Sequence, residues 1–106
     1  MSNWPFAEPP DTAVFTTQSV LDGARIRDVH HDEDGDWQIL CGTTLATEDA
    51  RIVHLAHLVE MAPSLASLAD LPRGWWAGRC DDVAHDGWHR RPVTLRARMR
   101  SLLRRR

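Results

Sequence analysis

Short apolar segments separated by turn residues dominate the first eighty positions of this chain. Residues 13–16 (Ala-Val-Phe-Thr) are β-branched and aromatic, which is typical of a strand. Thr17 can then cap a brief helix over residues 18–22, because its hydroxyl can accept a hydrogen bond from the first-turn amides, and Gly23 can supply a left-handed exit. The pattern therefore predicts a strand followed by one or two helical turns.

The clearest local signal is a β-hairpin. Residues 26–30 and 37–41 are strand-like and are joined by the polar segment 31–36. Asp34 and Gly35 lie at the expected reversal, since both residue types tolerate the positive φ that a tight hairpin turn requires.

Along the second strand of this hairpin, Trp37, Ile39 and Cys41 alternate with Gln38 and Leu40, so we expect Trp37 and Ile39 to face the core. Cys41 continues the same alternation beside apolar neighbours, which indicates a buried, unreactive thiol. Gly42 ends the strand. The serines offer no alternative nucleophile, because none lies in a GxSxG turn.

Residues 47–62 allow two interpretations. Apolar residues recur there at helical spacing, and Thr47 followed by two acids suits a helix start, so periodicity predicts one helix. Residues 51–55 (Arg-Ile-Val-His-Leu) would also serve as a short strand, in which case the helix begins near Leu55.

The next segment contains clear stop signals. Pro63 begins a further helical turn over residues 64–70, and Pro72 ends it. Arg73-Gly74 forms a turn, and residues 75–80 form a last strand. This order of elements predicts an α+β fold, a small antiparallel sheet with a central acidic-tipped hairpin, packed against two or three short helices.

The 106 residues suit one small domain. Three prolines make residues 1–12 an extended lead-in, so we expect ordered structure to begin near Thr12. Residues 13–90 form the domain. Residues 91–106 form an Arg-rich tail, either disordered or an amphipathic helix, since Leu and Met recur there at helical spacing.

The formal net charge of −2 conceals two opposing parts, because residues 1–89 sum to −10 and residues 90–106 sum to +8. Five acids crowd the hairpin and form a negative patch that can dock a basic partner protein. Successive strand residues face opposite sides of a sheet, so one of Trp75 and Trp76 is expected inside and the other exposed as a binding anchor. The candidate partner-binding residues are Asp28, Asp32, Glu33, Asp34, Asp36, Trp75 and Trp76.

Metal and cofactor chemistry has little support. The pairs His54/His57 and His85/His89 have helical spacing, but no complete ligand signature accompanies them. The aspartates around Gly35 differ from a calcium loop in the position of the glycine, and the loop has no terminal Glu. We assign no catalytic residue, cofactor or metal ligand and expect a non-enzymatic protein.

No export signal or transmembrane run is expected, and two cysteines are too few for a disulfide framework, so a cytoplasmic location is the default.

Several motifs between about Val14 and Arg79 carry a family resemblance. They are the acids leading into Gly-Asp-Trp-Gln-Ile-Leu, then Ile-Val-His-Leu, Leu-Val-Glu-Met-Ala-Pro-Ser-Leu and Leu-Pro-Arg-Gly. The chain resembles a bacterial family of small domains of unknown function grouped with the immunity proteins of polymorphic toxin systems. Ala62-Pro63 stands where that family usually has Asp-Pro. The resemblance implies a strand over residues 51–54 and a protein that binds and blocks a cognate toxin.

Two other functions remain open. Arginine-rich segments bind nucleic acids and anionic membranes by neutralising phosphates, and Trp88 could add base stacking. The tail would then act through Arg96, Arg98, Arg100 and Arg104. A small metal-dependent enzyme is the third alternative.

Overall fold

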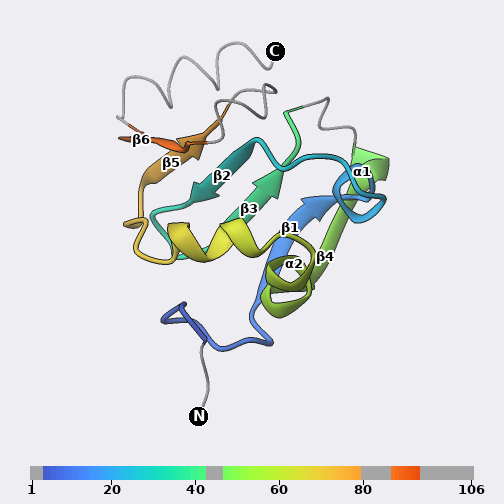
Figure 1. Cartoon of the computed structure of the whole chain (residues 1–106), viewed down its shortest axis with the longest axis horizontal. Coiled ribbons are helices and arrows are strands. Elements are labelled where there is room, and N and C mark those ends of the chain that lie inside the picture. Colours follow the sequence, from blue (N-terminus) through green and yellow to red (C-terminus); the bar gives the residue numbers. More distant parts are fainter. Residues whose placement is uncertain (1–3, 43–46, 80–86, 94–106) are drawn as a thin grey trace.

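The computed structural model describes residues 4–42, 47–79 and 87–93. The described strands form one mixed six-stranded sheet in the order β4-β1-β3-β2-β5-β6. Short helices lie across it (Figure 1). The α+β class expected from the sequence is confirmed. In chain order the elements are β1 (Ala13–Thr17), α1 (Gln18–Leu21), β2 (Asp28–His31), β3 (Trp37–Leu40), η1 (Thr47–Asp49), β4 (Ala50–His54), α2 (Leu55–Met61), η2 (Pro63–Leu68), β5 (Trp75–Gly78) and β6 (His89–Pro92).

The sheet is not purely antiparallel, so that expectation is wrong. β1 and β3 are parallel neighbours, with Phe15 opposite Gln38. After β1 the chain reverses direction through α1 and continues into β2. The hairpin then reverses it again, so that β3 runs beside β1 in the same direction. β4 pairs antiparallel with the other side of β1.

The helix cap and the turn glycines that the sequence indicated are present in the structure, at α1 and between β2 and β3. The Thr17 hydroxyl accepts a 3.3 Å hydrogen bond from the Val20 amide at the start of α1. Gly23 follows this helix with φ of 106°, and Gly35 has φ of 96° at the turn between β2 and β3. Both angles lie in the left-handed region, where glycine carries no side-chain penalty.

Residues 47–62 do not form one helix, so that interpretation is wrong. β4 pairs with β1 along its whole length, from Ala50 opposite Thr17 to His54 opposite Ala13. α2 then begins at Leu55, as the alternative interpretation had it. The β-branched pair Ile52-Val53 suits this strand, and pairing with the free side of β1 prevails over helical periodicity.

The core lies on one face of the sheet. Strand residues such as Val14, Val29 and Ile39 form one buried cluster with residues from α1, α2 and η2, namely Val20, Leu58, Leu65 and Leu68. Figure 1 shows α2 and η2 crossing the sheet on this side, η2 in yellow.

The lead-in belongs to the core, which corrects the expectation that order begins near Thr12. Phe6 is buried and meets the Trp37 ring edge to face, with centroids 5.5 Å apart. Trp4 packs against Phe6 in turn. The prolines favour an extended lead-in, and the aromatic side chains of Trp4 and Phe6 attach this segment to the sheet.

No pattern of residues predicts β6. This strand pairs with β5 from Gly78 opposite His89 to Trp75 opposite Pro92, and it crosses the domain boundary placed after residue 90. Pro92 is tolerated because β6 is an edge strand. The rest of the predicted tail, including its four candidate arginines, lies outside the described residues.

Candidate functional site

The sheet has a second face, opposite the core, on which no helix of the described residues packs. We call it the open face. Cross-strand pairing aligns one residue from each strand along it. From β4 to β6 this row is Ile52, Phe15, Gln38, His30, Trp76 and Arg91.

Trp76 is held firmly on the open face. Its indole Nε1 donates a 3.3 Å hydrogen bond to Asp28 Oδ1, and the Arg91 guanidinium carbon lies 4.5 Å from the ring centroid. The His30 ring lies beside it, at 6.5 Å between centroids. Trp75 lies on the other face against the core. Both tryptophans are half-buried, and Trp76 is the one on the face without helices.

Burial lowers the pKa of His30 below its ordinary value, and the charges of Asp28 and Asp32 oppose that shift. Asp28 and His30 occupy alternate positions of β2, so they share the open face. Asp32 lies just beyond the end of the strand and accepts a hydrogen bond from Gln38 of the same face. Because desolvation is the larger effect, His30 favours its neutral form at physiological pH.

The acids of the hairpin divide into two groups. Asp32 accepts a 2.9 Å hydrogen bond from Gln38 Nε2, and Asp28 accepts the one from Trp76, so both carboxylates help to order the open face. The others are exposed at the turn, in a group that we call the acidic tip: Glu33, Asp34 and Asp36.

A cation lies beside the acidic tip, which sequence reasoning missed. A Cβ placed on Gly35 would lie 3.0 Å from Nη2 of Arg73, so the guanidinium lies directly over the turn. Arg73 is distant in sequence from the hairpin, and only the β2–β5 pairing brings the two together. The tip is therefore less negative than its sequence indicates.

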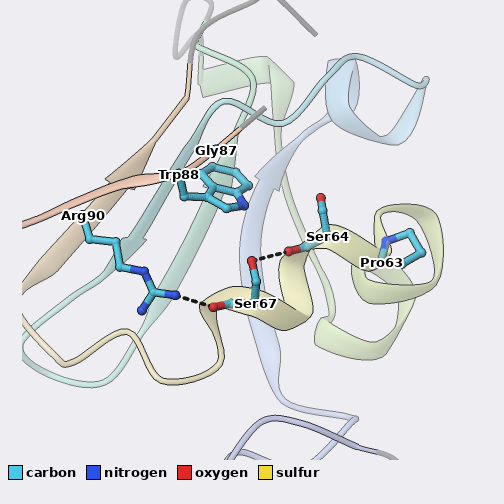
Figure 2. Close-up of a pocket in the computed structure, with 6 residues that line it drawn as sticks. All are labelled: Pro63, Ser64, Ser67, Gly87, Trp88 and Arg90. Carbon is cyan, nitrogen blue, oxygen red and sulfur yellow. Dashed lines mark hydrogen bonds between the residues drawn. The ribbon is translucent and has the colours of Figure 1, made fainter. Parts of the chain in front are cut away.

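A separate hollow of about 460 Å³ lies beside η2 (Figure 2). Figure 2 shows the Arg90 guanidinium directed toward Ser67, whose carbonyl oxygen accepts its hydrogen bond. Arg90 also pairs with Asp70 at 2.6 Å, and this contact lowers the pKa of the Asp70 carboxyl. Trp88 supplies the apolar wall and stacks against Arg79, at 4.3 Å from guanidinium carbon to ring centroid. With these cations engaged by the fold, the hollow offers apolar contact more than anion binding.

A third cluster is buried and fastens the lead-in to the sheet. His31 Nδ1 lies 2.7 Å from the Leu71 carbonyl oxygen, and its Nε2 lies 3.5 Å from Glu8 Oε2. The same Glu8 oxygen accepts a 3.0 Å hydrogen bond from Trp37 Nε1. Sequence reasoning gave Glu8 no role, although it follows two aromatic residues in an otherwise proline-rich segment.

The histidine pairs considered for metal binding do not form helical pairs. His54 ends β4 while His57 lies in α2, and His89 lies in β6 while His85 is outside the described residues. Across residues 4–42, 47–79 and 87–93, no group of three or more His, Cys, Asp or Glu side chains could hold a metal ion. Cys41 is buried, as predicted.

No family model, curated protein or solved structure matches this chain. Within the part of the chain that the structure describes, no helix is long and apolar enough to cross a membrane. The open face and the acidic tip are therefore the features on which a function can be argued.

Proposed function

We propose that this chain is a non-enzymatic protein-binding module of the immunity type, which docks a basic partner protein on the open face and the acidic tip. The observation that carries the proposal is the position of Trp76. It lies between Asp28 and Arg91 on a sheet face that no described helix covers. The family resemblance of the sequence suggests a toxin as the partner.

Trp76 has the properties of a binding anchor. Tryptophan and arginine are enriched among the residues that dominate interface energies, because they bury large surfaces and also form polar contacts. The contacts to Asp28 and Arg91 already restrict the rotation of the indole, so less conformational entropy is lost on binding.

Charge supports a basic partner. The first 89 residues carry a formal charge of −10, and the acidic tip projects exposed carboxylates beside the open face. Charge complementarity of this kind accelerates association and orients the partner. Arg73 does not neutralise the acidic tip, because its one positive charge lies beside three carboxylates.

Nucleic-acid or membrane binding through the Arg-rich tail is the alternative. Two arginines near its start are already occupied, since Arg90 binds Asp70 and the Ser67 carbonyl while Arg91 stacks on Trp76. These contacts favour the open face over the tail as the docking surface.

The proposal is tested by measuring affinity for the product of an adjacent gene that encodes a secreted toxin domain. We expect Trp76→Ala to weaken binding by roughly thirtyfold or more, the factor typical of an anchor residue. Asp34→Lys is expected to slow association, while Glu60→Lys, the same charge change on exposed α2, leaves it unchanged.

A variant with Arg96, Arg98, Arg100 and Arg104 changed to Gln separates the alternatives. Under the proposal it binds the toxin as the unmodified chain does. The proposal is overturned if Trp76→Ala binds normally, or if only the arginine variant loses binding. Circular dichroism of each variant checks that it is folded.

A further inference from the structure

We propose that two copies of this chain pair edge to edge through β4, which joins their sheets into one. β4 ends the sheet on the side opposite β6, and within the described residues it pairs only with β1. The inference is independent of the proposed function, because the open-face residues Asp28, Trp76 and Arg91 lie toward the other end of the sheet.

The hydrogen-bond pattern shows which backbone groups of β4 point away from its one strand partner within the described residues, β1. The Leu55 amide donates to the Thr12 carbonyl at 2.9 Å, and antiparallel pairing alternates from there. Val53 and Arg51 therefore direct their N–H and C=O groups toward β1. Those of Ala50, Ile52 and His54 point away from β1, where another strand can pair with them. The Ala50 carbonyl already accepts one hydrogen bond from Arg51 Nη1, and its second lone pair remains for a partner strand.

The residues of β4 itself carry little protection against further strand pairing. Natural edge strands avoid further pairing with proline, lysine or a bulge, and β4 has none of these. Its charged residue, Arg51, is held by its own chain. Arg51 Nε donates to Gln18 Oε1 at 3.0 Å, and its Nη1 donates to the Glu48 and Ala50 carbonyls, both at 2.8 Å.

An apolar patch accompanies the free edge. The Ile52 side chain is 65% exposed, and its cross-strand neighbour Phe15 is 43% exposed, both on the open face. When two β4 strands pair around a two-fold axis at Ile52, the isoleucines meet and the phenylalanines flank them. The patch then becomes a continuous apolar strip across the joined sheets.

Self-complementarity identifies a second copy as the occupant. Pairing centred on Ile52 sets Ala50 opposite His54 of the other copy, so every outward residue of β4 finds a partner. Glu48 and Asp49 precede the strand, and His54 and His57 accompany its end. Antiparallel pairing brings the acidic residues of each copy toward the histidines of the other copy, at both ends of the paired strands. A strand of unrelated sequence would match this arrangement only by chance.

Sedimentation equilibrium of the full chain over a broad concentration range tests the proposal. We expect a monomer–dimer equilibrium with a dissociation constant of roughly micromolar order, since the interface is smaller than that of obligate dimers. Ile52→Lys should abolish the dimer, because two like charges then meet at the axis. Met61→Lys is the matched control on α2, where an equally large apolar side chain is 42% exposed, and should leave the dimer intact.

Ile52→Pro is a second test, because proline removes an N–H that points away from β1 and so preserves the β1–β4 pairing. It should also yield a folded monomer. A chain that stays monomeric at all concentrations overturns the proposal, as does an Ile52→Lys variant that dimerises normally.

Disulfide formation tests the register. Directly opposed residues of a hydrogen-bonded antiparallel pair have Cα atoms about 5.5 Å apart, within the range a disulfide spans. In a chain carrying Cys41→Ala and Cys80→Ser, we expect Ile52→Cys to oxidise to a covalent dimer and Met61→Cys to remain largely monomeric. Equal crosslinking of the two variants would contradict the two-fold axis at Ile52.

Discussion

The imidazole of His31 lies flat on the indole of Trp37, with ring centroids 3.9 Å apart and planes inclined by 11°. Glu8 Oε2 lies near both rings, at 3.0 Å from Trp37 Nε1 and 3.5 Å from His31 Nε2. One carboxylate of the lead-in is therefore tied to both strands of the hairpin, whose other face carries Asp28 and His30.

Removing this carboxylate should destabilise the protein. Glu8→Ala leaves the buried Trp37 N–H without its acceptor, and such a loss costs about 1–3 kcal/mol in the free energy of unfolding. Urea denaturation followed by circular dichroism measures the change. Glu60→Ala on exposed α2 should change it by less than about 0.5 kcal/mol. Equal effects of the two substitutions would show that Glu8 does not fasten the lead-in.

Gly35→Ala should destabilise the hairpin through its backbone. A residue with a Cβ at a φ of 96° is strained, at a cost of about 1–2 kcal/mol. The nearest obstacle is the flexible end of Arg73, so adding Arg73→Ala should not restore stability. Gly87→Ala, with nothing within 4 Å of its added Cβ, is the matched control. Recovery of stability in the double variant would point to steric crowding in place of backbone strain.

Stability should depend on pH through His30. Its pKa is lowered in the folded protein by burial, and the unfolded chain has the ordinary value of about 6.5. Between these values the unfolded state binds more protons, so this contribution to stability is complete above pH ~6.5 and decreases as the pH falls through the folded pKa. Asp28 and Asp32 reduce the effect, while the neighbours on β3 and β5, Gln38 and Trp76, are neutral.

Thermal unfolding between pH 7.5 and pH 5 measures this dependence. His30→Asn should lose less stability on acidification than the unmodified chain. His57→Asn, at an exposed site on α2, should retain the original dependence. An unchanged profile for His30→Asn would mean that burial of this ring does not oppose its protonation.

The sequence best predicted those features that depend on interactions between residues close together in the chain. A cap such as Thr17 and a turn residue such as Gly35 act within a few positions, so their patterns indicate the result directly. β4 has helical periodicity and becomes a strand because β1 offers a partner. β6, His-Arg-Arg-Pro, has no apolar alternation at all and is held by its pairing with β5.

The candidate site was predictable only in part, because it depends both on local alternation along a strand and on pairing between distant strands. Strand alternation placed Trp75 and Trp76 on opposite faces, but the location of the helices decided which of them reached the open face. The contacts of Trp76 with Asp28 and Arg91 depend on the register of three strands. Sequence spacing alone does not contain that register.

The indole N–H resonances of the full chain offer the most direct test of the open face as a docking surface. In two-dimensional ¹⁵N NMR spectra, titration with the partner that the proposed function expects, a toxin domain encoded by an adjacent gene, should shift or broaden the Trp76 indole signal. The Trp88 signal, from the hollow beside η2, should stay in place. A titration that moves Trp88 and leaves Trp76 unchanged would contradict the proposed function.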